Sequence, residues 1–225
     1  MLTITWSTGL KEDGFMRLPE TFGTKAPWLC AALLACSAPP SNEPGWHIVP
    51  GHSAGGVTRA SSERDLIVTY GKDAVEPSRV ELGEGETAPG TLLFGADSAR
   101  RLEIIWKDTV SRSQPTRLVW RGSTSLWQLP GRIGLGSSLR EIEEQNSGPF
   151  TLAGFGWDYS GVVVDWTGAT LAASLPGVRL YLAPGPAQRE SARYGKVLGD
   201  RDYSSTNEHM QSLNPRVYQI FMDFE

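Results

Sequence analysis

The chain has 225 residues, of which 40% are hydrophobic and 20% charged, and its formal net charge is −4. This length suits one full-sized domain or two small ones. Eight tryptophans, seven phenylalanines and six tyrosines supply apolar area for a packed core, which excludes a wholly disordered protein. The acidic balance excludes a broad basic surface, so we expect no nucleic acid partner. The 25 glycines and 15 prolines predict many turns and short elements.

Residues 1–36 have the pattern of a secretory signal. Arg17 and Lys25 precede an apolar run at 26–35, and a Pro- and Ser-rich linker follows at 37–45. The run is shorter than the roughly 20 residues that a membrane span needs. The prolines after it stop any helix. We therefore expect a removable export signal rather than a core helix.

Leu33-Leu34-Ala35-Cys36 resembles the lipobox of bacterial lipoproteins, in which the cysteine becomes the first mature residue and carries the lipid. The resemblance implies lipid attachment at Cys36, and Ser37 resembles an outer-membrane sorting signal. Stable anchoring takes more than one acyl chain. We expect a lipoprotein of the bacterial cell envelope, held in the outer membrane and facing the periplasm. Residues 1–15 lengthen the leader and make it less basic, so we expect Met16 to be the true start.

The other cysteine, Cys30, lies in the same segment, so the rest of the chain has none. A disulfide framework, a cysteine-ligated zinc site and a cysteine nucleophile are therefore excluded from the body of the protein.

A weak internal repeat runs through the body. Residues 57–66 align with residues 133–142, and the offset is a constant 76, as from Ser62 to Ser138. In both stretches an aliphatic residue leads to Ser-Ser, then to Arg, an acid and another aliphatic residue. Ser138 and Glu141 have the spacing of a capping box, and Ser62 has an acid at the same spacing. Each stretch therefore predicts a short helix, and these helices end near Gly71 and near Gly148-Pro149.

Short aliphatic and aromatic runs broken by turn residues follow each helix, which predicts antiparallel strands. The predicted strands are 91–94, 102–106, 117–120, 150–155, 162–166, 178–182 and 217–222. A polar loop at 183–214 contains a helix predicted to begin at Ser205 or Thr206. The acidic stretch 81–86 predicts an exposed turn.

The predicted fold class is α+β, with two related units at 46–130 and 131–225. Each unit is a short capped helix followed by an antiparallel β-meander. This arrangement resembles the small lipoproteins of outer-membrane assembly and the secreted β-lactamase inhibitor proteins. The Gly-Phe-Gly-Trp-Asp-Tyr-Ser-Gly stretch at 154–161 also looks like a stretch found in uncharacterised bacterial envelope proteins.

One motif points to an enzyme. Gly51-His52-Ser53-Ala54-Gly55 matches the G-x-S-x-G elbow of serine hydrolases, and Asp202 and His209 follow in the order that a triad requires. The elbow needs a buried strand before the serine and a helix directly after it. Pro50 before Ser53 and the glycines after it predict neither. We interpret the motif as a glycine-rich loop and keep a hydrolase using Ser53, His209 and Asp202 as the alternative.

The most promising contact residues lie in the 154–161 stretch. Trp157 and Tyr159 beside Asp158 could stack on a sugar ring or anchor a protein partner. Asp158 and Asp165 could also be considered as paired carboxylates of a glycosidase. The three histidines lack metal-ligand spacing, so we expect no metal and no cofactor.

The leading hypothesis is a non-enzymatic envelope lipoprotein that acts through protein or cell-wall contacts. Its expected partners are the membrane, through the lipid, and an envelope protein or peptidoglycan. The alternatives are the secreted serine hydrolase and a small carbohydrate-binding module that uses Trp157 and Tyr159.

Overall fold

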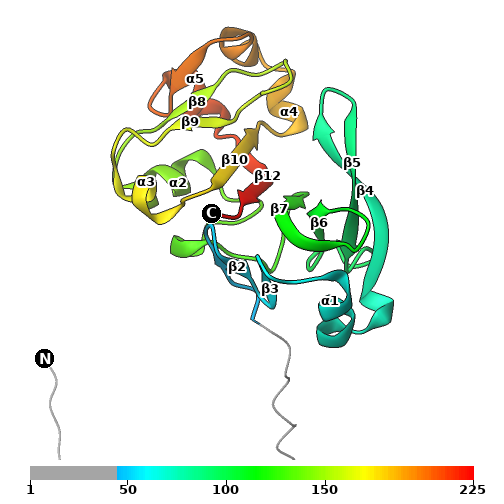
Figure 1. The fold of residues 1–225 in the computed structure, drawn as a ribbon. Helices are drawn as coiled ribbons and strands as arrows, with labels where there is room; N and C mark the ends of the chain where they lie inside the picture. Colours follow the sequence, from blue (N-terminus) through cyan, green and yellow to red (C-terminus); the bar gives the residue numbers. More distant parts are fainter. Residues whose placement is uncertain (1–44) are drawn as a thin grey trace, which may run out of the picture. The chain divides into compact units, whose positions relative to one another are not determined.

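A computed structural model describes residues 45–225 of the chain (Figure 1). The predicted signal segment, its lipobox at Cys36 and nearly all of the linker lie outside the described residues. The predicted α+β class is confirmed, because the body combines short helices with antiparallel sheets.

The strands form three antiparallel sheets, with the orders β1-β2-β3, β10-β12-β7-β6-β5-β4 and β11-β8-β9. The strands are β1 Ile48–Val49, β2 Ser53–Ala54, β3 Val57–Thr58, β4 Val75–Gly83, β5 Glu86–Leu93, β6 Leu102–Asp108, β7 Ser113–Arg121, β8 Thr151–Ala153, β9 Val163–Asp165, β10 Val178–Ala183, β11 Asp202–Ser204 and β12 Arg216–Asp223. The helices are α1 Glu63–Tyr70, α2 Leu139–Asn146, α3 Thr170–Ser174, α4 Pro186–Arg189 and α5 Glu208–Leu213, with short 3₁₀ turns at Lys72–Ala74, Pro130–Arg132 and Tyr194–Val197.

Both predicted helix starts are confirmed. The Ser62 side chain accepts a hydrogen bond from the Asp65 backbone N–H, and the Asp65 carboxylate accepts one from the backbone of Ser62. Ser138 and Glu141 make the same reciprocal pair at the start of α2. These bonds satisfy backbone donors that have no partner within the helix. α1 stops before Gly71, and α2 stops where Ser147 adopts the left-handed conformation.

The hydrogen bonds that hold these two helices also repeat at the 76-residue offset. The Thr58 N–H donates to Ser61 Oγ at 2.9 Å, and the Gly134 N–H donates to Ser137 Oγ at 3.0 Å. The carbonyl of Ser61 accepts from the second residue of β7, and that of Ser137 accepts from the second residue of β12. β7 and β12 are antiparallel neighbours in the interior of the six-stranded sheet. Strands from both 46–130 and 131–225 thus join in one sheet.

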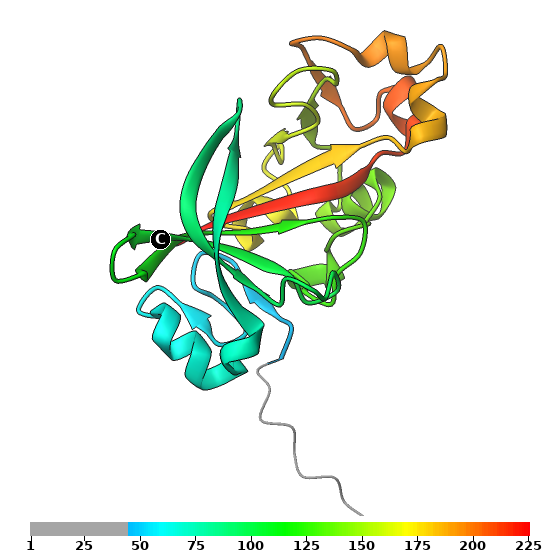
Figure 2. The ribbon, with the colours of Figure 1, turned by 90° about the vertical axis from the view of Figure 1, so that its right-hand side faces the viewer.

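The two faces of the large sheet are buried differently. One face belongs to the main core, which includes Leu66 and Ile142 of the two capped helices. The other face has a smaller apolar cluster made of Val80, Val119, Tyr181 and Phe221. Val80 reaches this cluster from β4 because the β4–β5 hairpin is strongly bent (Figure 2). The bent hairpin and the second face of the sheet together form a pocket.

Candidate binding pocket

The structure separates the alternative catalytic residues. Ser53 lies on β2 and His209 on α5, at opposite ends of the described body (Figure 1). Asp202 lies on β11. No helix begins at Ser53, since α1 starts ten residues later at Glu63. A triad needs nucleophile and base within hydrogen-bond reach, so this fold does not assemble Ser53 with His209.

Asp165, which was considered with Asp158 as a glycosidase pair, is bonded within its own turn. Asp165 Oδ1 accepts a hydrogen bond from the Thr167 backbone N–H at 2.7 Å, which is turn chemistry. Asp165 does not line the pocket that contains Asp158. Within residues 45–225, no group of three or more His, Cys, Asp or Glu side chains could hold a metal ion. The same residues contain no helix that is long and apolar enough to cross a membrane.

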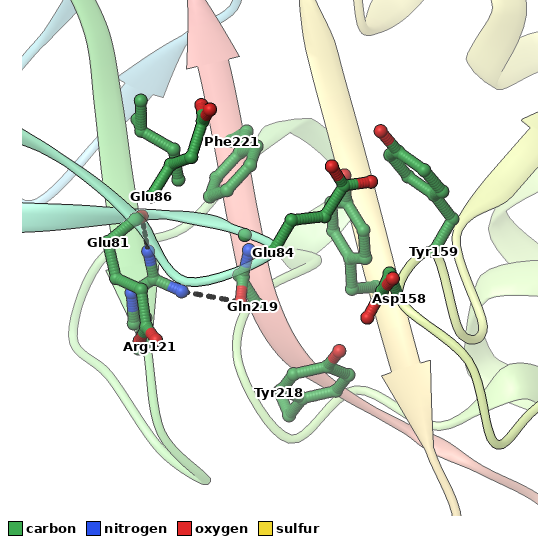
Figure 3. A pocket seen from close by; sticks show the side chains of 12 residues that line it. Glu81, Glu84, Glu86, Arg121, Asp158, Tyr159, Tyr218, Gln219 and Phe221 are labelled. Carbon is green, nitrogen blue, oxygen red and sulfur yellow. Dashed lines mark hydrogen bonds between the residues drawn. The ribbon is translucent and has the colours of Figure 1, made fainter.

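Asp158 and Tyr159 do lie at a pocket, and the acidic stretch 81–86 lies at the same pocket (Figure 3). We call residues 81–86 the hairpin tip, because they contain the turn between β4 and β5 and the adjoining strand ends. Residues 157–159 are the WDY loop. The pocket has a volume of about 260 Å³, and its floor is the second face of the sheet. Its lining residues are Glu81, Leu82, Gly83, Glu84, Glu86, Arg121, Asp158, Tyr159, Tyr181, Tyr218, Gln219 and Phe221.

A glycine positions the WDY loop against β10. Gly161 has φ 69°, and a Cβ built there would lie 1.9 Å from the Leu182 carbonyl oxygen, so only glycine fits. The Leu182 N–H donates to the Gly161 carbonyl at 2.9 Å. Trp157 Nε1 donates to the Gly154 carbonyl at 3.0 Å, and its ring meets that of Tyr159 edge-on at 5.6 Å. These contacts leave Tyr159 49% exposed at the pocket rim.

Arg121 of β7 ties the hairpin tip to the sheet (Figure 3). Its Nη2 donates to the Glu81 carbonyl, and its Nη1 donates to Gln219 Oε1 at 2.7 Å. Its Nε donates to Glu103 Oε2 at 3.2 Å, which forms an ion pair with a carboxylate whose residue is only 7% exposed. The guanidinium also lies 5.6 Å from the centre of the Phe221 ring. Arg121 therefore has partners on every side and serves to hold the pocket together.

The Tyr181 ring is buried in the floor of the pocket. The residue is 6% exposed, and its ring packs edge-on against Phe221 at 5.3 Å and near Tyr218 at 6.5 Å. None of the hydrogen bonds within residues 45–225 involves its hydroxyl, which lines the pocket. Burial raises the pKa of Tyr181 and that of Tyr218, so both hydroxyls stay protonated at neutral pH. This hydroxyl is open to the pocket, where it can form a hydrogen bond with a bound group.

The lining is strongly acidic. Four carboxylates surround the opening, and the single guanidinium among them is already engaged with Glu103. A second hollow of about 530 Å³ adjoins the first, with which it shares Asp158 and Tyr218, and Trp157, Arg189 and Tyr194 also line it. All three predicted contact residues thus lie at this pair of hollows. The sequence did not single out Tyr181, Tyr218 or Arg121. The available signal was their position on or beside predicted strands, where alternate side chains point to the same face of a sheet.

Comparison with protein-family models, with curated proteins and with solved structures finds no match to this chain.

Proposed function

We propose that this protein is a non-enzymatic, lipid-anchored binding protein of the bacterial envelope, and that it holds its ligand in the pocket between the hairpin tip and the WDY loop. The observation that carries the binding role is a pocket built from five separate chain segments, whose four carboxylates form no ion pair within residues 45–225. The anchor rests on the lipobox at Cys36, and the expected placement is the outer membrane, facing the periplasm. The partner is an envelope protein or peptidoglycan.

Binding is favoured over catalysis by the chemistry of the lining. Its side chains are tyrosines, carboxylates, one paired arginine and one glutamine, with no serine, cysteine, histidine or lysine among them. Nucleophilic catalysis by the commonest route pairs a nucleophile with an adjacent base. The secreted-hydrolase alternative loses support because Ser53 and His209 lie at opposite ends of the described body.

The anchor is tested by metabolic labelling of the full chain with an alkyne fatty acid in a bacterial host. We expect incorporation into the wild-type chain, loss of the label in Cys36→Ser and retention in Cys30→Ser, the matched control. Incorporation that persists in Cys36→Ser would contradict the lipid assignment.

The pocket is tested by photocrosslinking in cells. A photoreactive benzoylphenylalanine replaces Tyr159, which is 49% exposed at the rim, or Val164, which is 48% exposed on β9. We expect a crosslinked adduct from position 159 that is absent from position 164. Glu84→Arg, an exposed substitution on the hairpin tip, should abolish the adduct by placing a basic side chain over the opening. Equal adducts from both positions would contradict a specific site.

A further inference from the structure

We propose that the pocket binds a positively charged side chain, an ammonium or guanidinium group on an alkyl stem, presented by a basic segment of a protein partner. This inference rests on the proposed function, since it names the chemistry of the ligand for the same pocket. It is carried by three observations: carboxylates without ion pairs, the exposed rings of Tyr159 and Tyr218, and the Tyr181 hydroxyl, which forms no hydrogen bond within residues 45–225.

The carboxylates of the pocket are without cations of their own. Glu84 and Glu86 of the hairpin tip and Asp158 of the WDY loop line the opening. Within residues 45–225 no lysine, arginine or histidine forms an ion pair with any of them. Arg121 is directed to Glu103 and Gln219 instead. Several uncompensated carboxylates around one concave opening create a negative potential that attracts a cation and repels an anion.

The aromatic lining adds a second attraction for the same group. Tyrosine rings attract a cation placed over their faces within about 6 Å. The sheet face beside the pocket already shows this chemistry, because the guanidinium carbons of Arg117 and Arg179 lie 5.2 Å and 5.3 Å from the centre of the Phe221 ring. The Tyr181 hydroxyl oxygen can accept a hydrogen bond from an ammonium or guanidinium N–H. A cation would thus interact with the Tyr181 hydroxyl, the rings and the carboxylates together.

Size and surroundings favour a side chain of a larger partner. The volume of about 260 Å³ is below the range of roughly 300–1,000 Å³ typical of drug-sized ligands. The adjoining hollow, which contains Trp157 and Tyr194, begins at the Asp158 and Tyr218 that both hollows share. Exposed aromatic side chains of this kind are typical anchors in protein interfaces. The flanking residues of a basic segment can lie there while its charged side chain enters the pocket.

The test uses the full chain purified in detergent and measures fluorescence anisotropy of a labelled, blocked Gly-Lys-Gly peptide. Two matched peptides replace the lysine by norleucine, which is nearly isosteric and neutral, or by Nε-acetyl-lysine. We expect the two neutral peptides to bind at least about tenfold more weakly than the lysine peptide. Raising the salt concentration should weaken the lysine peptide severalfold and leave the neutral peptides unchanged.

Variants locate the binding. Glu84→Gln with Asp158→Asn should weaken the lysine peptide by about tenfold, and Tyr181→Phe by about threefold through the lost acceptor. Glu144→Gln, an exposed carboxylate on α2, and Tyr203→Phe, whose hydroxyl donates to the Lys196 carbonyl, are controls outside the pocket and should bind like the wild type. Thermal unfolding of each variant separates lost binding from lost folding.

The failure of this inference is distinguishable from failure of the proposed function. Equal binding of the norleucine and lysine peptides, or no binding of either, overturns the cationic ligand. If peptidoglycan fragments or chito-oligosaccharides bind and Tyr181→Phe weakens them, the cationic ligand is also overturned, but the pocket keeps its binding role. The comparison of crosslinking from positions 159 and 164 tests that role without any assumption about charge.

Discussion

At the scale of single residues, the pocket depends on a buried carboxylate. Glu103 is 7% exposed and pairs with Arg101 at 3.2 Å and with Arg121 at 3.2 Å. Such a pair adds little net stability compared with a hydrophobic replacement, but removing one partner leaves a poorly solvated charge behind. Arg121 also holds the Glu81 carbonyl, so its loss frees the hairpin tip from the sheet.

We therefore predict that Arg121→Met lowers the free energy of unfolding by about 2 kcal/mol, less than for a fully broken buried pair because Arg101 remains. Urea denaturation measures the change. Arg193→Met, at an exposed position without an ion pair among the described residues, should be nearly neutral. Adding Glu103→Gln to Arg121→Met should recover part of the loss. A loss that Glu103→Gln does not relieve would show that the buried charge is not its cause.

The tyrosines of the pocket predict a dependence on alkaline pH. Burial raises the pKa of Tyr181 above its ordinary value of 10.0, so the folded state holds the phenolic proton more tightly than the unfolded state. This contribution to stability is fully present below the unfolded pKa and is lost as the pH rises through the folded pKa. Tyr181→Phe should therefore lose less stability than the wild type between neutral pH and the alkaline range above 10.0. Denaturant titrations at a series of pH values measure this. Identical curves for Tyr181→Phe and the wild type would contradict the assignment.

At the scale of elements, the two capped helices are the part that local sequence predicts best. The capping boxes at Ser62 and Ser138 involve residues three apart, so the pattern is visible without knowledge of the fold. α5 was predicted two or three residues early, because Asn207 caps it and not Ser205. The Ser205 hydroxyl instead donates to Glu143 at 2.6 Å, a contact between distant parts of the chain. Glu143 therefore anchors this segment.

Strands with a clear local pattern were also predicted, whereas a strand that depends on its place in the sheet was not. The runs at 102–106 and 178–182 became β6 and β10, since their aliphatic residues alternate in the usual way. β4 at Val75–Gly83 was not predicted, because its proline and charged residues resemble a loop. Those residues are tolerated there because β4 is the edge strand of the sheet.

The cap of α2 gives a prediction at this scale. Ser138→Ala should lower the free energy of unfolding by about 1 kcal/mol, the usual effect of losing a capping hydroxyl. Ser212→Ala, at an exposed position within α5, should have little effect. The backbone N–H of Ser138, followed by its hydroxyl, lowers the pKa of Glu141 below 4.5. The stability from Glu141 is thus present above its unfolded pKa and is lost as the pH falls through the lower folded pKa. Thermal unfolding at neutral and acid pH should show Ser138→Ala approaching the wild type in acid, and an unchanged gap would contradict the reciprocal pair.

At the scale of the whole described body, the pocket is a product of distant pairing. The hairpin tip at 81–86 and the WDY loop at 157–159 were each noticed in the sequence, as an acidic turn and as an aromatic contact stretch. Their meeting was not predictable, because it depends on β12 pairing with β7 and on the bend of the β4–β5 hairpin. Neither pairing partner nor bend is encoded in a short window of residues. The repeat explains part of the β7–β12 pairing, since α1 docks at the start of β7 in the same way as α2 docks at the start of β12.

One glycine allows a close approach between β5 and its neighbouring strands. A Cβ at Gly90 would lie 2.4 Å from the Ile104 carbonyl oxygen on β6 and 2.7 Å from Val80 Cγ2, so any side chain there pushes β5 away from its neighbours. We predict that Gly90→Ala lowers the free energy of unfolding by about 1–3 kcal/mol, as for other overpacked sites. A displaced β5 would also shift the hairpin tip relative to Tyr181, so the photocrosslink from position 159 should weaken even where the protein stays folded. Gly148→Ala is the matched control, because nothing lies within 4 Å of a Cβ there. Urea denaturation and the crosslink yield measure the two effects. A Gly90→Ala variant as stable as Gly148→Ala, with an undiminished crosslink, would show that the close approach at Gly90 does not shape the pocket.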